Sequence, residues 1–239
     1  MTLMPPIAVL AGGLATRMGH LTRNMPKSML EVAGKPFIVH QLDLFKREGI
    51  RRVVLCTGHL SEIIEAFVGD GNRFGLQVTY SCERKDLLGT GGALRVALPL
   101  LGPELMIIYG DSYLDISFAP VVEAFRQSGR KGLMTVFHNA GCWDASNVEW
   151  DGSRILDYLK TPTPRMKHID FGLAVMKASV FESLPRGEPF DLAVIYRKLV
   201  AAGDLAGYNI SQRFYEIGSV AGLAETDAYL RTKVPRGAS

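Results

Sequence analysis

The stretch Leu10-Ala-Gly-Gly-Leu-Ala-Thr-Arg-Met-Gly19 decides the fold, because an apolar run over residues 7–11 ends there in Gly12 and Gly13. The apolar run predicts a buried strand, and the two glycines predict that a loop follows it. Glycines directly after a strand let backbone N–H groups approach an anionic ligand closely. Arg17 and Lys27 add two positive charges near this loop. Together these features predict a polyphosphate-binding site.

The spacing of these glycines matches neither of two common phosphate-binding motifs. It lacks both the G-x-G-x-x-G of dinucleotide folds and the G-x-x-x-x-G-K-[ST] of P-loops. Taken alone, Gly12 and Gly13 are therefore equally consistent with a tight turn whose neighbouring cations are solvated.

Composition narrows the class of protein. A chain of 239 residues with 47% hydrophobic and 21% charged residues is typical of an ordinary globular protein. The net charge of +3 is too small to indicate a nucleic-acid partner, and no apolar run approaches the roughly 18–20 residues of a membrane span. The start lacks a secretion signal, and Cys56, Cys82 and Cys142 lack C-x-x-C spacing, which favours thiols in the cytoplasm.

Strands alternate with helical patterns in the first half of the chain. Apolar runs predict strands over 7–11, 52–56, 76–81 and 105–109, and helical spacing predicts helices after Pro36, over 61–67 and over 93–98. This alternation predicts an α/β fold, a Rossmann-like three-layer sandwich with a mixed, mostly parallel central sheet.

The second half is more irregular and predicts a small antiparallel extension of the sheet. Strand patterns cover 133–137, 147–150, 155–160, 169–176 and a region over 208–216, and Asp151-Gly152 predicts a hairpin turn. Helical patterns cover 178–184, 192–202 and a last helix from Ser219. Without a linker or repeat, we expect one domain over 1–233; residues 234–239 resemble a protease-site remnant and are treated as a tail.

Asp111 follows the predicted strand over 105–109 and Gly110. Ligands of open α/β sheets gather beyond the carboxyl ends of the strands, which places Asp111 and the Gly12 loop at the same rim. A lone aspartate at such a place is otherwise most often a turn or a helix cap.

The motifs Gly-Gly-x-x-Thr-Arg-Met, Pro26-Lys-Ser-Met-Leu30 and Lys35-Pro-Phe37 resemble the opening of the sugar-1-phosphate nucleotidyltransferases. These enzymes join a nucleoside triphosphate to a sugar 1-phosphate and release pyrophosphate. The molybdenum-cofactor guanylyltransferases share the start, but their lysine follows the arginine after fewer residues than Lys27 does here. The loop Leu88-Gly-Thr-Gly-Gly-Ala93 and the compact length are most similar to heptose- and mannose-1-phosphate guanylyltransferases, which implies GTP as the donor.

The resemblance implies a set of functional residues. It assigns catalysis to Arg17, Lys27 and Asp111, with Mg²⁺ held by Asp111 and Glu216. It assigns nucleotide binding to the two glycine loops and their approach, namely Leu10, Ala11, Gly12, Gly13, Glu83, Gly89, Thr90 and Gly91. It assigns the sugar phosphate to Asn147, Lys160, Asp170 and Gly172.

Two positions depart from the family pattern. Glu216 stands where the family has the Asp of Asp-[IV]-Gly-[ST], and Asp170 stands where it commonly has the Asn of Asn-x-Gly-[IL]-Tyr. The longer Glu216 side chain would bind the ion directly or through water, and the carboxylate of Asp170 implies a different sugar.

Other functions remain open. A cytidylyl- or uridylyltransferase acting on another phosphorylated or phosphonate acceptor fits the same motifs, and Glu216 and Asp170 leave room for a catalytically silent nucleotide-sugar sensor. A Rossmann oxidoreductase is disfavoured by the missing fingerprint. The expected partners are the two substrates, without nucleic acid or membrane, in a monomer or homodimer.

Overall fold

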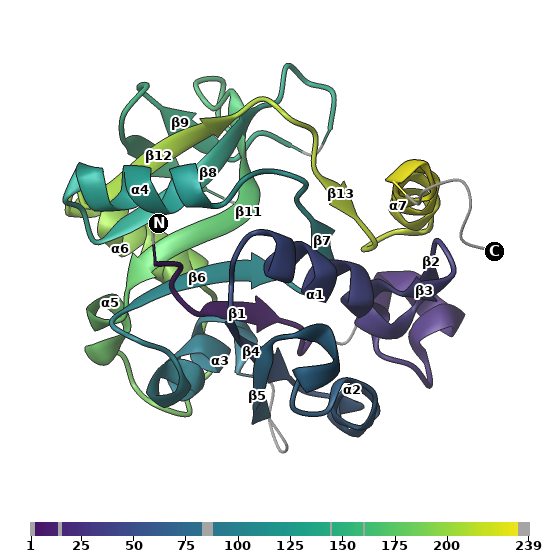
Figure 1. Cartoon of the computed structure of the whole chain (residues 1–239). Coiled ribbons are helices and arrows are strands. Elements are labelled where there is room, and N and C mark those ends of the chain that lie inside the picture. The colour runs from purple at the N-terminus through teal and green to yellow at the C-terminus, as the bar shows by residue number, and fades with distance from the viewer. Residues whose placement is uncertain (1–2, 14–15, 83–87, 144, 160, 234–239) are drawn as a thin grey trace.

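The computed structural model describes residues 3–13, 16–82, 88–143, 145–159 and 161–233, and only the backbone of Thr16, Arg17 and His20. Its central sheet holds nine strands within these residues (Figure 1). They are β1 (Ile7–Leu10), β4 (Arg52–Thr57), β5 (Gln77–Cys82), β6 (Glu104–Tyr109), β8 (Gly132–His138), β9 (Val148–Trp150), β10 (Ile155–Tyr158), β11 (His168–Lys177) and β12 (Leu205–Ile210). The strands predicted in the first half of the chain are thus confirmed.

The sheet is parallel in its first half and mixed in its second. β5, β4, β1 and β6 lie side by side in parallel, and β12 pairs in parallel with β8. The long strand β11 runs antiparallel to β6, β8 and β9 and joins the two halves into one sheet. β9 and β10 form the predicted hairpin, in which the Asp151 carboxylate accepts hydrogen bonds from the N–H groups of Ser153 and Arg154, both at 2.9 Å. The mixed, mostly parallel α/β sheet is confirmed.

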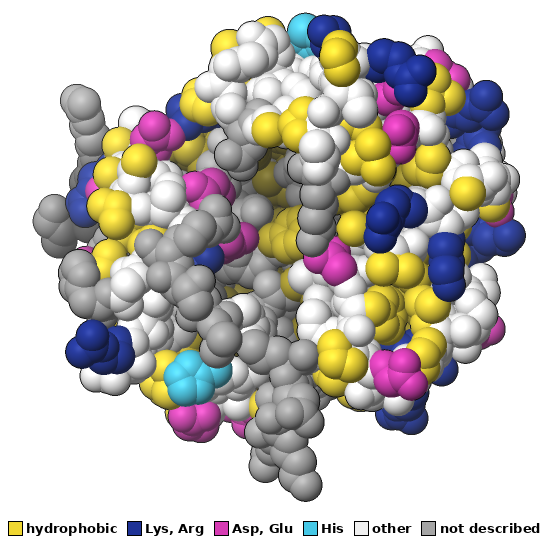
Figure 2. All heavy atoms as spheres, turned by 180° about the vertical axis from the view of Figure 1, so that it is seen from behind, with side chains coloured by type: hydrophobic (Ala, Val, Ile, Leu, Met, Phe, Trp, Pro, Cys, Tyr) yellow, Lys and Arg dark blue, Asp and Glu magenta, His cyan; other side chains and the backbone are white. Residues whose placement is uncertain are grey.

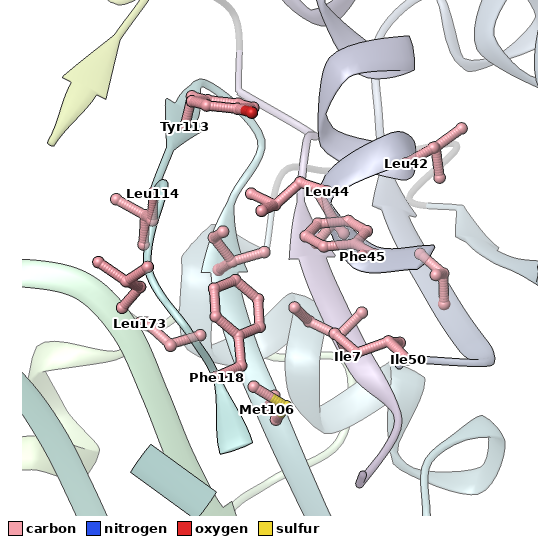
Figure 3. Close-up of a cluster of buried hydrophobic side chains, with 14 of the residues drawn as sticks. Ile7, Leu42, Leu44, Phe45, Ile50, Met106, Tyr113, Leu114, Phe118 and Leu173 are labelled. Carbon is pink, nitrogen blue, oxygen red and sulfur yellow. The ribbon is translucent and has the colours of Figure 1, made fainter. Parts of the chain in front are cut away.

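Helices cover both faces of this sheet. α1 (Phe37–Arg47), α2 (Ser61–Val68) and α4 (Ala119–Ser128) pack on one face, and α3 (Gly89–Ala97), α5 (Ser179–Glu182) and α6 (Ala193–Ala201) pack on the other. Because successive strand side chains point to opposite faces, Ile7 and Val9 of β1 enter one core and Ala8 enters the other. Figure 3 shows the first core, where Ile7, Phe45 and Phe118 come together from β1, α1 and the segment before α4.

Small elements lie at the rim of the sheet. They are the antiparallel pairs β2 (Glu31–Val32) with β3 (Lys35–Pro36) and β7 (Ser112–Tyr113) with β13 (Tyr215–Glu216), and the short 3₁₀ turns η1 (Thr16–Thr22), η2 (Lys27–Met29), η3 (Asn72–Phe74) and η4 (Leu98–Leu100). Through β7 and β13, the segment before the last helix reaches the end of β6.

The last helix, α7 (Val220–Lys233), lies beside the β2–β3 hairpin (Figure 1). Its buried side chains are Thr226 and Leu230, so polar contacts contribute much of its attachment. Asp115 accepts hydrogen bonds from Tyr229 (2.6 Å), Arg47 (2.6 Å) and Lys233 (3.0 Å). Burial alone would raise the pKa of Asp115, but these hydrogen bonds outweigh it and lower the pKa to about 2.

The structure differs from the sequence prediction at three places. Helix α4 was not predicted, although Pro120 near its start and Gly129 in a left-handed conformation after its end are typical helix signals. The strand region expected over 208–216 is two strands, because the chain leaves β8 after Ile210 and pairs with β7 from Tyr215. The second glycine loop is the first turn of α3 rather than a loop before it.

Among the described residues, no helix combines the length and the apolar composition that crossing a membrane requires.

Candidate active site

A cavity of about 270 Å³ opens at the carboxyl ends of β1, β4 and β6. It is lined by both glycine segments and by the ends of these strands: Leu10, Ala11, Gly12, Gly13, Lys27, Ser28, Cys56, Gly89, Thr90, Ala93, Tyr109, Gly110 and Asp111. Figure 2 shows that the face opposite to that of Figure 1 is hollowed near its middle, with hydrophobic, acidic and basic side chains around the hollow. The rim of the sheet that was predicted to bind ligands therefore contains a cavity.

The two glycines of the first loop differ in their surroundings. Gly12 and Gly58 pack backbone to backbone, and a Cβ on Gly58 would lie 2.8 Å from the Gly12 carbonyl oxygen. Among the described residues, none places a heavy atom within 4 Å of the position that a Cβ on Gly13 would take, and Gly13 lines the cavity. The close approach to Gly12 therefore requires a glycine at position 58, since a Cβ on Gly12 itself would come no nearer than 3.4 Å, whereas the bare backbone at Gly13 leaves room for a ligand.

Lys27 and Asp111 meet at this cavity although they are far apart in the sequence. The Lys27 ammonium lies 3.0 Å from Asp111 Oδ2, and the two side chains are 17% and 28% exposed. Lys27 is carried by the 3₁₀ turn η2, and Asp111 follows β6 after Gly110. A Cβ on Gly110 would lie 2.9 Å from Ala11, so glycine is required for this turn to pass the first loop. The structure thus brings together the cation and the acid that were predicted to share a rim.

Gln41 holds the turn that carries Asp111, a role that the sequence did not reveal. Its side chain is 1% exposed, and its amide nitrogen donates to the carbonyl oxygens of Tyr109 (3.0 Å) and Ser112 (2.8 Å). Gln41 lies on the buried face of α1, the helix that the pattern after Pro36 predicted. The sequence signal for this role is a polar residue among apolar neighbours on the buried helix face, because a buried amide needs hydrogen-bond partners.

Glu216 approaches Asp111 through the β7–β13 pair. The Ile217 N–H donates to the Asp111 carbonyl oxygen at 2.9 Å. A Cβ on Gly218 would lie 3.3 Å from Asp111 Oδ2 and would clash with Glu216 Oε2, so the two carboxylates flank this glycine. The Glu216 carboxylate also accepts hydrogen bonds from Gly218 N and from the Ser219 hydroxyl, which fixes it next to the first turn of α7.

The second glycine segment serves packing as well as the cavity. Gly89 and Thr90 line the cavity, whereas Gly91 is not one of its lining residues. A Cβ on Gly91 would clash with the Phe190 ring, and one on Gly92 would lie 2.7 Å from the Glu188 carbonyl oxygen. The glycines of α3 therefore let the chain around Phe190 pack directly on its first turn.

The residues expected at the sugar side form a second cluster next to the cavity. Asn147 Oδ1 accepts from the Asp170 N–H, and Asp170 Oδ1 accepts from the Gly172 N–H, both at 3.0 Å. The place of a Cβ on Gly172, a residue with φ of +99°, is 3.6 Å from the ring of Tyr109, which lines the cavity. Burial raises the pKa of Asp170 to about 6. The pKa of the Tyr109 hydroxyl is also raised, first by its burial and then by the negative charge of Asp170.

Three predicted site residues are not placed. Glu83 and Lys160 lie outside the described residues, as does the side chain of Arg17. Their expected roles remain predictions.

A cavity at the strand ends, lined by two glycine segments and a lysine–aspartate pair, is typical of the ligand-binding α/β proteins. The family model described as Nucleotidyl transferase matches residues 7–141. The chain belongs to this nucleotidyl transferase family, as the resemblance implied.

Curated relatives agree with this family, and a solved structure agrees with the fold. Mannose-1-phosphate guanylyltransferase of Mycobacterium tuberculosis is 32% identical over 211 residues, which cover 87% of this chain. This chain matches 58% of that relative's length. N-acetylmuramate alpha-1-phosphate uridylyltransferase of Neisseria meningitidis is 29% identical and is covered over 96% of its length, with 92% of this chain. The structure of HddC from Yersinia pseudotuberculosis complexed with GMP-PN superposes with a TM-score of 0.77 at 19% identity, over 95% of this chain and 100% of that one, which supports the fold.

Proposed function

We propose that this chain transfers a nucleoside monophosphate from a nucleoside triphosphate to a sugar 1-phosphate and releases pyrophosphate. The observation that carries this proposal is the Lys27–Asp111 pair at 3.0 Å in the cavity lined by both glycine segments. In such a transfer, a phosphate oxygen of the acceptor attacks the α-phosphorus, and the bond from that phosphorus to the bridging oxygen of the β-phosphate breaks. Positioning and charge neutralisation supply most of the catalysis.

The site residues predicted from the sequence each have a proposed part in this transfer. The backbone N–H groups at Gly12 and Gly13, together with Arg17, bind the β- and γ-phosphates. Lys27 stabilises the charge that develops at the α-phosphate, and Lys160 binds the acceptor phosphate. Asn147, Asp170 and Gly172 contact the sugar, because their cluster adjoins the cavity at Tyr109.

The donor set of this site fits Mg²⁺. Asp111 and Glu216 supply carboxylate oxygens on the two sides of Gly218. Within the described residues, no set of three or more His, Cys, Asp or Glu side chains converges as a metal site. Two carboxylates suffice for Mg²⁺, which usually completes its shell with water and substrate phosphates. We therefore propose that Asp111 and Glu216 hold Mg²⁺, which would offset the negative charge of the phosphates.

The donor base and the acceptor are proposals that rest on relatives. The mannose-1-phosphate guanylyltransferase of M. tuberculosis supports GTP with mannose 1-phosphate. The sequence resemblance to heptose-1-phosphate guanylyltransferases adds heptose 1-phosphate as a second proposed acceptor. The uridylyltransferase of N. meningitidis, which this chain matches over nearly its full length, makes UTP the competing donor. We also propose one domain over 1–233, because β11 joins both halves of the sheet, and a cytoplasmic monomer or homodimer.

A substrate panel tests this proposal. The full chain is incubated with Mg²⁺, each of four nucleoside triphosphates and a set of sugar 1-phosphates, and pyrophosphate release is measured. We expect release with one preferred triphosphate only when a sugar 1-phosphate is present. Triphosphate binding without release for any of these acceptors would contradict a sugar-1-phosphate nucleotidyltransferase and would favour a nucleotide-sugar sensor or a transferase acting on another acceptor.

A further inference from the structure

Ser28 lines the cavity and carries a buried hydroxyl group that has no part in the transfer proposed above. The residue follows Lys27 in the turn η2, it lines the cavity, and it is 4% exposed. Within the described part of the chain, its Oγ is buried without a hydrogen-bond partner. Most buried polar atoms have a partner, so a hydroxyl without one beside a cavity indicates a contact to a ligand.

Three other polar side chains of the lining have protein partners. Lys27 and Asp111 pair with each other, and the Thr90 hydroxyl accepts a hydrogen bond from the Leu192 N–H at 2.8 Å. The Ser28 hydroxyl thus differs from these three side chains in having no partner among the residues that the structure describes.

The position of Ser28 next to Lys27 indicates which part of the ligand it meets. Phosphate oxygens are hydrogen-bond acceptors and are drawn to the cation of Lys27 and to the loop N–H groups, whereas a hydroxyl can donate one hydrogen. We propose that Ser28 donates a hydrogen bond to a phosphate oxygen of the bound nucleoside triphosphate. This inference rests on the proposed function and adds a phosphate-binding residue to it.

Thr57 provides a matched control. Its hydroxyl is likewise buried without a partner among the described residues, its residue is 0% exposed, and it does not line the cavity. Replacing either hydroxyl by an apolar group removes an unsatisfied buried polar atom, so neither Ser28→Ala nor Thr57→Val should lower the melting temperature of the protein without ligand.

The test compares ligand affinities of the wild type, Ser28→Ala and Thr57→Val by calorimetry. The probes are the preferred nucleoside triphosphate, inorganic tripolyphosphate and the corresponding nucleoside. A hydrogen bond to a charged group predicts a loss of about ten- to a hundredfold for both phosphate ligands in Ser28→Ala. Nucleoside affinity should be unchanged in that variant, and Thr57→Val should bind all three probes like the wild type.

Several results would overturn the proposal. They are phosphate-ligand affinities of Ser28→Ala within about twofold of the wild type, a loss confined to the nucleoside, an equal loss in Thr57→Val, or a lower melting temperature of Ser28→Ala without ligand. Ser28→Thr, which keeps the hydroxyl, should retain more phosphate affinity than Ser28→Ala, and failure to do so would also count against it. If the wild type binds no triphosphate, the proposed function falls together with this inference. If the wild type binds the triphosphate and Ser28→Ala binds it equally well, the inference falls alone.

Discussion

Replacing Lys27 by alanine removes the ammonium group from the Asp111 carboxylate and from the cavity. In the structure, the two groups are 3.0 Å apart, and their side chains are 17% and 28% exposed. The substitution therefore changes two quantities that can be measured separately: the free energy of unfolding and the rate of nucleotidyl transfer.

The effect on stability is small. At 3.0 Å and an effective dielectric constant of about 20, the attraction of the pair is about 5 kcal/mol, most of which desolvation offsets. Because both side chains keep some contact with water, we expect Lys27→Ala to lower the free energy of unfolding by about 1–2 kcal/mol, or the melting temperature by about 2–8 °C. The fold survives such a loss.

The effect on turnover is large. Removing a preorganised group that stabilises charge in the transition state costs about 3–4 kcal/mol, or about a hundred- to a thousandfold in kcat. Lys27→Arg keeps the charge but replaces a compact ammonium by a planar fork, so it should recover only part of the rate.

The assay is pyrophosphate release at saturating substrates, together with thermal unfolding of each variant. Lys35→Ala is the matched control, because Lys35 is 53% exposed and lies 3.9 Å from Asp43, itself 54% exposed. This control should keep wild-type turnover. Turnover of Lys27→Ala close to that of the wild type would refute the assignment of Lys27 to the site.

Four further predictions follow from contacts around the site. Gln41→Leu removes the donor to the Tyr109 and Ser112 carbonyl oxygens, so it should lower the free energy of unfolding by about 2–4 kcal/mol and reduce turnover. An unchanged midpoint of urea unfolding would show that Gln41 does not hold the turn that carries Asp111. Glu216→Gln should raise the Mg²⁺ concentration for half-maximal turnover about tenfold or more, and an unchanged Mg²⁺ dependence would remove Glu216 from the metal site. Burial raises the pKa of Asp170 to about 6, so the ionised carboxylate lowers the free energy of unfolding above pH 6, and the protonated group has no such effect below about pH 4. Asp170→Asn should therefore have a free energy of unfolding about 2–3 kcal/mol above that of the wild type at pH 8 and equal to it at pH 4, as measured by urea unfolding. The pKa of Asp115 is lowered to about 2, so its contribution of about 2 kcal/mol is present above about pH 4 and is lost as the pH falls through 2; Asp115→Ala should destabilise the protein at pH 7 and progressively less below pH 4.

The sequence predicted the first half of the fold well, because buried parallel strands are apolar runs bounded by turn residues. The runs at β1, β4 and β6 are of this kind, and their order along the chain placed Asp111 and the Gly12 loop at one rim. The rule that ligands gather at strand ends was sufficient for that step.

Interactions between segments that are distant in the sequence were harder to predict. The segment over 208–216 divides into β12 and β13 because β8 and β7 pair with its two ends, and neither partner is apparent from local pattern. The glycines of α3 reflect the packing of Phe190, a residue far along the chain.

Buried polar side chains were the hardest to interpret. Gln41 and Ser28 occupy positions that spacing alone assigns to a helix face or to a loop. Their partners, or the lack of them, depend on the tertiary arrangement of backbone carbonyl groups and of the cavity.

The most direct test of the central claim is a crystal structure of this chain with a non-hydrolysable nucleoside triphosphate and Mg²⁺. We predict that the phosphates lie against the Gly12–Gly13 backbone beside Lys27 and that the metal contacts the Asp111 carboxylate. A nucleotide bound away from that loop, or a metal bound without Asp111, would contradict the account.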